Sequence, residues 1–411
     1  MTLQLAQEFD LIDPLAKKRA EFLLPRDTIY LDGNSLGPLP KVAKTRVEEV
    51  VGKQWGEDLI ASWNKNNWIS LPATVGDKIA PLIGAAQGQV VCCDSISINL
   101  FKLLAAALNL QSTRKIVLSQ TDNFPTDLYA AQGLSSLLGE TQCQLKLVDV
   151  KSIVESLDES IAVLLLTHVN FRGGEKHDMA LITKLAHAKG ILVIWDLAHS
   201  AGAMPLQLDA AKVDFAVGCG YKYFNGGPGA PAFIYVAARH QSKVKQPLAG
   251  WMGDQSPFDF NSQYKAAPGI NKFLSGTPNI ISMAALDAAL DVFCDVDLEQ
   301  LWQKSMKLSE LFRQTVSQHT GLDALLLISP NDPEQRGSQL AYSHPDAFAI
   351  SQALIDHKVI VDFRAPNILR FGFTPLYTRF IDVSRAAQIL EEIFTKKIYQ
   401  HKQYQAKQQV T

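Results

Sequence analysis

Two ionisable side chains follow apolar, β-rich runs of the chain. Asp196 comes directly after ILVIW (191–195), and Lys222 comes shortly after VDFAVGC (213–219). A buried carboxylate is costly without a partner, and desolvation lowers the pKa of a lysine so that its neutral amine can form an imine. Each residue also has an ordinary interpretation. Asp196 could cap a helix, and Lys222 could be a loop lysine whose stem lies on apolar surface.

The two side chains together favour one chemistry more strongly than either does alone. Open α/β sheets bind their ligands beyond the carboxyl ends of the strands. At that edge a carboxylate such as Asp196 can keep a pyridine nitrogen protonated, so that the ring becomes an electron sink. The pair therefore predicts a pyridoxal-5′-phosphate (PLP) site, with the cofactor held as a Schiff base on Lys222.

Two expected helix N-termini could complete such a site. Ser95, Ile96 and Ser97 open an apolar helix, and free backbone N–H groups at a helix N-terminus bind phosphate well. Phe124 and Asp127 open the next helix, where Phe124 could stack on a ring and Asp127 could bond its substituents. The alternatives are simple N-capping by Ser95 and, at the second helix, a hydrophobic staple followed by capping residues.

Alternating strands and helices must position these residues. The expected strands are 115–120, 144–150, 161–169, 191–196, 213–220 and 231–236. The expected helices are 97–110, 124–138 and 180–190, the last closed by Gly190. Several strands are apolar at nearly every position, as in a sheet that is covered on both faces. This alternation predicts an α/β domain with a mostly parallel sheet flanked by helices.

Beyond Pro278 the pattern is less regular. It indicates helices at 282–293, 298–318 and about 346–357, a turn-rich loop at 329–338, and short strands within 340–345, 359–366 and 368–375. We therefore expect a large PLP-binding domain over residues 60–290, and a smaller α+β domain formed by residues 1–59 and 291–411.

Composition limits the kind of partner. The chain has 411 residues, with 39 Lys and Arg against 41 Asp and Glu, and this balance gives no support for a nucleic-acid or membrane partner. Five cysteines without a C-x-x-C motif suggest reduced thiols. The first residues lack the apolar core of a signal peptide, and the longest apolar runs are too short to span a bilayer. We expect a cytoplasmic protein that binds a small molecule and no metal.

Nearly the whole chain resembles the kynureninase family, in the fold-type I, aminotransferase class V group of PLP enzymes. The segments that carry the resemblance are YLDGNSLGPLP (30–40), DSISINLFK (94–102), FPTD (124–127), WDLAHSAGA (195–203), GYKYFNGGPGAPAF (220–233), GWMGD (250–254) and FLSGTP (273–278). The fourth and fifth are typical of the superfamily, whereas FPTD and GWMGD in one chain are more specific to kynureninase.

The resemblance implies a reaction. L-Kynurenine, or 3-hydroxy-L-kynurenine, would be hydrolysed at the Cβ–Cγ bond to anthranilate, or 3-hydroxyanthranilate, and L-alanine. Both substrates stay open, as does the choice between tryptophan breakdown and a biosynthetic branch such as that to NAD.

The resemblance also implies a role for each matching position. Lys222 would form the Schiff base and move the Cα proton, Asp196 would partner the pyridine nitrogen, and Tyr221 would hold the phosphate and relay protons. The other cofactor contacts within the same subunit would be Ile96, Ser97, Phe124, Asp127, Thr167 and His199.

Five further positions would act on the substrate or across a subunit boundary. Arg370 would pair with the substrate α-carboxylate, which a planar guanidinium can bind through two N–H groups. Asn34 and Ser35 would line the substrate pocket. Trp251 and Thr277 would reach a phosphate in the neighbouring subunit, which implies a homodimer with active sites at the interface. The ordinary alternatives are a surface arginine on an edge strand for Arg370 and a simple turn at 34–35.

Two other functions compete with this one. A cysteine desulfurase or a small-substrate transaminase would share the fold, but a desulfurase needs a nucleophilic cysteine on a mobile loop. The loop 329–338 has no cysteine, Cys294 lies in an apparent helix, and Phe124 stands where desulfurases usually stack a histidine. A non-catalytic protein of the same fold is disfavoured because Lys222 is present together with Asp196.

Overall fold

A seven-stranded sheet forms the centre of the larger part of the molecule. The computed structural model describes residues 3–406. In spatial order the strands are β4 (Val90–Cys92), β10 (Ala232–Val236), β9 (Phe215–Cys219), β8 (Leu192–Asp196), β7 (Ile161–Thr167), β5 (Ile116–Gln120) and β6 (Gln144–Val148). β10 alone runs in the direction opposite to that of the other six strands. The predicted α/β fold with a mostly parallel sheet is confirmed.

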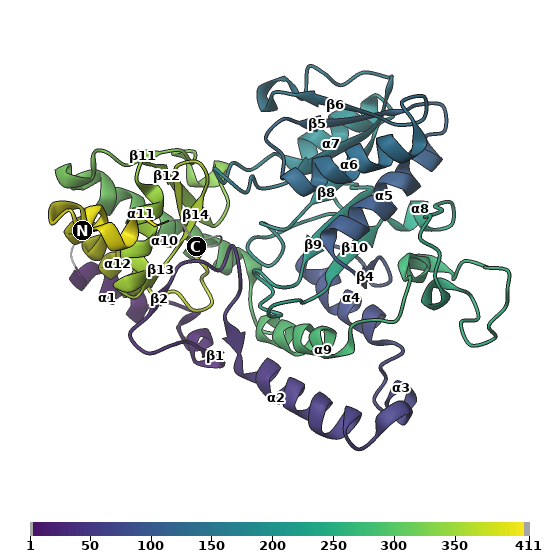
Figure 1. Cartoon of the computed structure of the whole chain (residues 1–411), viewed down its shortest axis with the longest axis horizontal. Helices are drawn as coiled ribbons and strands as arrows, with labels where there is room; N and C mark the ends of the chain where they lie inside the picture. Colours follow the sequence, from purple (N-terminus) through teal and green to yellow (C-terminus); the bar gives the residue numbers. More distant parts are fainter. Residues whose placement is uncertain (1–2, 407–411) are drawn as a thin grey trace.

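Helices cover both faces of this sheet (Figure 1). They are α4 (Leu71–Leu82), α5 (Ile96–Leu110), α6 (Pro125–Leu138), α7 (Met179–Ala188) and α9 (Ile280–Ala289). Every residue of β7 is buried, and its side chains alternate between two hydrophobic clusters. Val163 and Leu165 join the cluster of α5, whereas Leu164 and Leu166 join that of α4 and α7. This two-sided burial explains why the strand is apolar from Ile161 to Leu166.

The strand register brings three strand ends to one edge. Thr167, the last residue of β7, lies opposite Asp196, the last residue of β8. Asp196 in turn lies opposite Val217 of β9, which ends two residues later at Cys219. The loops that carry His199 and Lys222 therefore leave the sheet side by side, as expected for parallel strands.

The second part of the molecule is a four-stranded antiparallel sheet with its own helices. Its strands, in spatial order, are β11 (Leu326–Leu327), β12 (Gln339–Ser343), β15 (Ile368–Gly372) and β14 (Asp362–Arg364). Its helices are α10 (Leu298–Gln318), α11 (Ala347–Asp356) and α12 (Phe380–Thr395). The sequence pattern predicted β12, β14, β15, α10 and α11, but neither β11 nor α12. Figure 1 shows this part beside the large sheet.

The N-terminal segment contacts both parts. Helix α1 (Leu3–Leu11) packs on α12, and β2 (Ile29–Tyr30) pairs with β13 (Val359–Ile360). Helix α2 (Lys41–Glu49), in contrast, lies along α9 on the other part (Figure 1). The division of the chain at residues 59–60 and 290–291 stays a prediction.

The remaining elements are short. They are β1 (Phe22–Leu23), β3 (Leu39–Pro40), α3 (Ser62–Lys65) and α8 (Ala238–Gln241). The predicted helix 282–293 ends as an α-helix at Ala289 and continues as a 3-10 turn to Phe293. Between residues 3 and 406, no helix has the length and the apolar character needed to cross a membrane.

Candidate active site

A cavity of about 210 Å³ lies at the carboxyl edge of the large sheet. It is lined by Ser95, Ile96, Ser97, Phe124, Thr126, Thr167, Phe171, Asp196, Ala198, His199, Cys219, Tyr221, Lys222, Ala230 and Ala232. Eight of these residues were predicted cofactor contacts. The fold thus gathers side chains from three βα connections and from the loops after β8 and β9 around one space.

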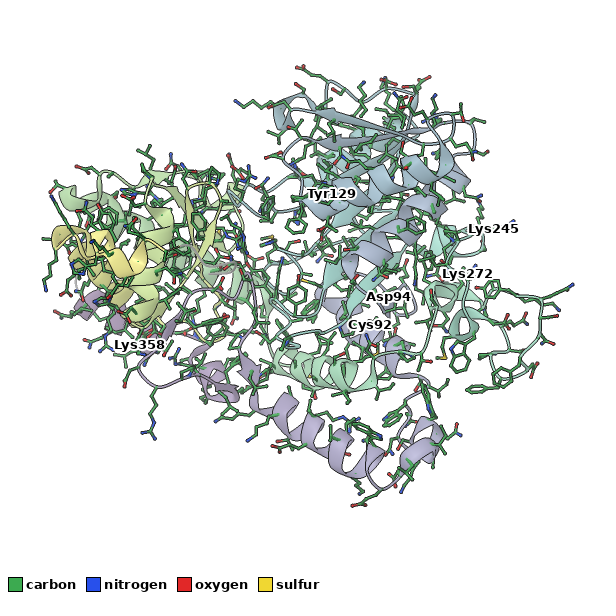
Figure 2. The ribbon with its side chains drawn as sticks, in the orientation of Figure 1. Cys92, Asp94, Tyr129, Lys245, Lys272 and Lys358 are labelled. Carbon is green, nitrogen blue, oxygen red and sulfur yellow. The ribbon has the colours of Figure 1, made fainter. Side chains whose placement is uncertain are left out.

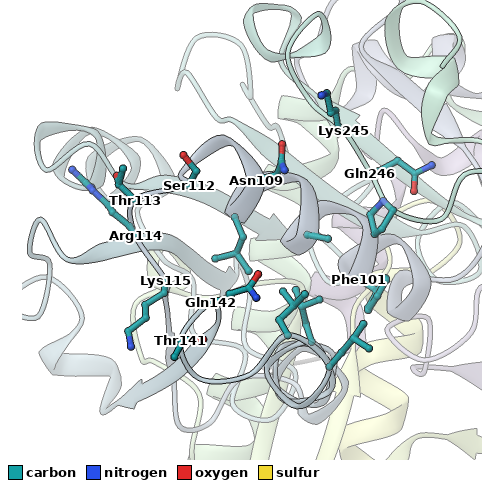
Figure 3. Close-up of a pocket in the computed structure, with 16 residues that line it drawn as sticks. Phe101, Asn109, Ser112, Thr113, Arg114, Lys115, Thr141, Gln142, Lys245 and Gln246 are labelled. Atoms are coloured by element: carbon teal, nitrogen blue, oxygen red, sulfur yellow. The ribbon is translucent and has the colours of Figure 1, made fainter. Parts of the chain in front are cut away.

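A larger hollow, of about 510 Å³, lies between α5 and α6 (Figure 3). The described residues around it include three cations, Arg114, Lys115 and Lys245, but no carboxylate, histidine or cysteine. Its hydroxyls and amines have no carboxylate or histidine beside them to act as a base, so the smaller cavity is the candidate active site.

The amine of Lys222 lies in the cavity beside an imidazole. Its Nζ is 3.0 Å from Nε2 of His199. Burial lowers the pKa of the Lys222 amine below its ordinary value. Burial, and then the charge of Lys222, holds the pKa of His199 well below its ordinary value. The histidine is therefore neutral and can accept a hydrogen bond from the amine, which is itself easier to deprotonate than an exposed lysine.

Asp196 is 2% exposed and lies at the end of β8. Its Oδ1 accepts a hydrogen bond from the backbone N–H of Ala198 at 2.8 Å, but turns rather than a helix follow at residues 198–203, so the helix-capping interpretation is wrong. Burial raises the pKa of Asp196 to about 6, although the Ala198 N–H and the Lys222 charge favour the ionised form. A cation close to this carboxylate would stabilise its charge.

Thr167, which lies opposite Asp196 in the sheet, binds a second buried carboxyl group. Its hydroxyl forms hydrogen bonds with Oδ1 of Asn123 and with Oδ2 of Asp127, the latter at 3.2 Å. Asp127 does not line the cavity and lies behind Thr167. Burial, and then the charge of Asp196, raises the pKa of Asp127 well above its ordinary value.

The N-terminus of α5 forms one end of the cavity. Ser95 caps the helix, since its Oγ accepts from the N–H of Ile98 at 3.5 Å. The N–H groups of Ile96 and Ser97, in the first turn, have no carbonyl within the helix to bond. Figure 2 shows Asp94, near the centre of the molecule, where β4 leads into α5. The buried Lys102 amine donates a hydrogen bond to Oδ2 of Asp94 at 2.6 Å and so fixes this turn.

Tyr221 and Phe124 stand at other walls of the cavity. Tyr221 is half-buried, and burial raises the pKa of its phenol. Phe124 is 39% exposed and packs edge-to-face on Phe171, with ring centroids 5.1 Å apart. Phe124 therefore has ring surface free of protein contacts, which a flat ligand in the cavity can cover.

Arg370 is not the surface arginine that one interpretation allowed. It is 1% exposed, and β15 lies between β12 and β14 rather than at an edge. Its Nε donates to Oδ1 of Asp362 at 2.7 Å, its Nη2 donates to Oδ2 of the same carboxylate, and its Nη1 donates to the carbonyl oxygen of Phe171. Phe171 lines the cavity and Arg370 does not, so the guanidinium lies behind Phe171.

Asn34 and Ser35 lie near Arg370 and do not line the cavity. The side chain of Asn34 is buried against Gly372, where a Cβ would overlap with its Oδ1. Ser35 Oγ donates to Oδ2 of Asp362 at 2.5 Å and accepts from Nη2 of Arg370 at 3.2 Å. The segment is thus a folded support for Arg370 rather than an isolated turn.

Trp251 and Thr277 are apart from the other predicted residues. Neither lines the cavity of its own chain. Thr277 is exposed, and Trp251 packs in an aromatic cluster with Phe258 and Phe260, both of which are exposed.

The cavity residues fit PLP in three respects. Asp196 is a buried carboxylate whose charge a pyridinium would compensate. His199 Nδ1 is buried and finds no hydrogen-bond partner in the part of the chain that the structure describes. The amine of Lys222 faces the same space as the free N–H groups of α5, which suit a phosphate. These residues can hold a flat cationic ring with an anionic tail.

Sequence reasoning missed several residues of this region. Thr126, Ala198 and Cys219 stand beside residues that were singled out, so the positions that follow each strand could have been examined more fully. Phe171 gave no such signal, because its contact with Arg370 joins residues far apart in the chain, and Asp362 was missed although it lies only eight positions before Arg370.

Curated relatives match the whole chain. It is 46% identical over 415 residues to a protein of Burkholderia pseudomallei named kynureninase, with 100% of each chain covered. It is 49% identical over 402 residues to a kynureninase of Deinococcus radiodurans, covering 95% of this chain and 97% of the relative. Residues 301–390 match the family model described as the kynureninase C-terminal domain.

Solved structures share the fold at lower identity. A cysteine desulfurase from Thermococcus onnurineus has a TM-score of 0.77 at 20% identity, covering 92% of this chain and 98% of the desulfurase. A mutant of C-DES with glycine covalently linked to its PLP cofactor has a TM-score of 0.78 at 16% identity, covering 90% and 98%. These likenesses show a common fold.

Proposed function

The chain belongs to the kynureninase family, and from this premise we propose that its cavity hydrolyses L-kynurenine, with PLP as cofactor, to anthranilate and L-alanine. The protein is a hydrolase that acts on a C–C bond. The observation that carries the assignment to this cavity is the placement of the Lys222 amine beside the neutral His199 and the buried Asp196.

PLP, when bound, supplies an electron sink for the bonds that break at the substrate. Lys222 would hold it covalently, Asp196 would keep its ring nitrogen protonated, and Phe124 would cover its ring. The N–H groups of Ile96 and Ser97 would hold its phosphate. The position of each residue in the lining of the cavity supports its assignment.

Proton transfer is the work of two residues in this proposal. The Lys222 Nζ, whose pKa is lowered by burial, removes the proton from the substrate Cα. Tyr221 is the second, and its hydroxyl relays a proton in the later steps. Because burial raises the pKa of this hydroxyl, it is protonated and able to donate. Water supplies the oxygen that the γ-carbonyl carbon gains when the Cβ–Cγ bond breaks.

A homodimer is part of the proposal. Trp251 and Thr277 lie outside the cavity of their own chain, and Phe258 and Phe260 add exposed aromatic surface beside Trp251. Exposed apolar clusters of this kind mark interfaces. We propose that Trp251 and Thr277 reach the phosphate of the neighbouring subunit.

A cytoplasmic location completes the proposal. All five cysteines are free thiols, four of them buried. Free thiols are typical of proteins in reducing compartments.

Anthranilate fluorescence tests the function directly. Purified holoenzyme should release anthranilate from L-kynurenine, and the same assay with 3-hydroxy-L-kynurenine ranks the two substrates. Incubation with L-cysteine and a sulfide assay serves as the control for desulfurase activity. We expect no sulfide, because the only cysteine among the cavity residues, Cys219, is buried and its pKa is raised by that burial. Sulfide release without anthranilate would refute the assignment.

A further inference from the structure

Asp362 holds two arginines at the boundary between the two parts of the molecule. Its carboxylate accepts hydrogen bonds from Nε and Nη2 of Arg370. Its Oδ2 also lies 3.0 Å from Nη2 of Arg364. Arg364 is partly exposed, whereas Asp362 and Arg370 are buried. A third contact to Asp362 comes from the hydroxyl of Ser35, in the N-terminal segment.

The contacts of Arg370 use its two edges differently. A guanidinium has five N–H donors in a planar fork. Asp362 occupies the edge formed by Nε and Nη2. The carbonyl oxygen of Phe171 and the hydroxyl of Ser35 accept from Nη1 and Nη2, at the other edge. Since Phe171 lines the cavity, this second edge is the one on the cavity side.

We propose that Asp362 is a positioning residue for substrate binding: it holds one edge of Arg370, so that the Nη1–Nη2 edge meets the substrate α-carboxylate where the Phe171 carbonyl and the Ser35 hydroxyl now lie. The inference rests on the proposed function, which assigns the α-carboxylate to Arg370. It adds that the substrate exchanges places with a backbone carbonyl of the loop after β7.

The charges around Asp362 support this role. Burial disfavours its ionised form, but the hydrogen bonds and charge of Arg370 outweigh that effect and hold the pKa of Asp362 below its ordinary value. Burial and the charge of Asp362 raise the pKa of the neighbouring Asp32 to about 7. Below pH 7, therefore, Asp362 carries the negative charge of this pair and Asp32 keeps its proton.

An asparagine at position 362 would break this arrangement. The amide oxygen can accept from Arg370, but the amide nitrogen is a donor and would face a donor of the guanidinium. Arg370 and Arg364 would then lose the Asp362 carboxylate that binds them both. The Arg370 guanidinium would turn away from the substrate. A misplacement of about 1 Å costs on the order of 10²-fold in rate or binding.

The experiment compares two ligands that differ only in the carboxylate. The holoenzyme and its Asp362→Asn variant are assayed for the KM and kcat of L-kynurenine, and for inhibition by the amine that decarboxylation of kynurenine produces. We expect the variant to raise KM by about 10²-fold with little change in kcat, as for lost ground-state binding. The inhibition constant of the amine should not change, because it has no carboxylate.

Asp382→Asn is the matched control. Asp382 is also buried and binds both Nε and Nη2 of an arginine, Arg379, but this arginine, unlike Arg370, forms no hydrogen bond with a described residue that lines the cavity. Its loss should change neither the KM of kynurenine nor the inhibition constant of the amine. Asp362→Glu keeps the charge and should give a KM between those of the wild type and of Asp362→Asn.

The two ligands also separate the outcomes. If Asp362→Asn weakens the amine as much as kynurenine, or changes neither constant, the positioning role is wrong. If Asp362→Asn does not fold, Asp362→Glu decides by the same comparison. Failure of the proposed function shows in the wild type alone, as absence of anthranilate. In that case, calorimetric binding of L-alanine against ethylamine, in wild type and variant, still tests the positioning of the carboxylate.

Discussion

The Lys222 amine and the His199 imidazole, 3.0 Å apart, are two nitrogen bases that burial makes harder to protonate. Two protonated groups at this distance would repel each other, so the pair holds at most one additional proton near neutral pH. Because burial lowers the pKa of the Lys222 amine, a larger fraction of it is neutral and able to attack an aldehyde than for an exposed lysine.

The first prediction concerns the capture of the cofactor. The cofactor-free protein should bind PLP at a rate that reaches half of its maximum below about pH 10.4, the pKa of an exposed lysine, because burial lowers the pKa of Lys222. Borohydride reduction should then place the label on the peptide that contains Lys222. Lys222→Ala should lose the label and the visible absorbance, whereas Lys184→Ala, an exposed lysine of α7, should keep both. A label that persists in Lys222→Ala would contradict the assignment.

The second prediction concerns stability against pH. Asp196 has a pKa of about 6 in the folded protein, raised by burial, and about 3.9 in an unfolded chain. Between these values the folded state binds more protons than the unfolded state, so the stability of the cofactor-free protein falls as pH rises from about 4 to about 6. Thermal melts should show this loss, and Asp196→Asn should reduce it.

Cofactor removal provides the matching comparison. With PLP bound, a ring cation near Asp196 would favour the ionised carboxylate, so the melting temperature should fall less over the same pH range. Asp32 titrates higher and in the same direction with or without cofactor, so the difference between the two forms reports on Asp196 and on Asp127, whose pKa depends on the charge of Asp196. Equal slopes for the two forms would mean that the ring nitrogen lies elsewhere.

The third prediction tests the shared site. Lys222→Ala and Trp251→Ala are each expected to be nearly inactive at limiting PLP. Mixed and reassociated, they should recover about a quarter of wild-type activity, because half of the dimers are hybrids and each hybrid has one site with both residues intact. Mixing Lys222→Ala with Asp196→Asn, two changes within one cavity, should recover nothing. Activity in that control mixture would show that the complementation has another cause.

The fourth prediction concerns the close approach of the N-terminal segment to the lysine loop. Gly37 donates its N–H to the carbonyl of Tyr221 at 2.8 Å, and a Cβ at Gly37 would overlap with the carbonyl oxygen of Lys222. Gly37→Ala should therefore destabilise the protein by about 1–3 kcal/mol and lower its occupancy with PLP. Gly52→Ala, where a Cβ meets nothing within 4 Å, should be neutral or slightly stabilising. Urea melts and the cofactor absorbance measure both effects.

The longer strands of the large sheet could be predicted from the sequence, because their apolar composition reflects their burial on both faces. Runs such as IAVLLL (161–166) are apolar at every position, and the structure buries each of these residues. The register then follows from parallel pairing, so Asp196 and Lys222 could be placed at one edge before the structure was known. Strand β4, with three residues, is too short to give such a pattern.

The arrangement around Arg370 could not be predicted in the same way. Phe171 lies 199 positions before it in the chain, and Ser35 lies 335 positions before it. No local pattern shows that a backbone carbonyl will occupy one edge of the guanidinium. Asp362, only eight positions away, is near enough to suggest a pairing, but its choice of edge depends on the antiparallel register of β14 and β15.

The pairing of β4 sets an order for the synthesis of this chain. Among the described strands, β4 pairs only with β10, and Cys92 and Ala232, which are in contact there, are 140 positions apart. A growing chain leaves the ribosome N-terminus first, at about 5–20 residues per second. The turn at the start of α5, which we propose binds the phosphate, therefore waits for several seconds without its neighbouring strand, and Arg370 emerges later still. If the proposed roles hold, the nascent protein can close its cofactor cavity before the residue for the substrate carboxylate has been made.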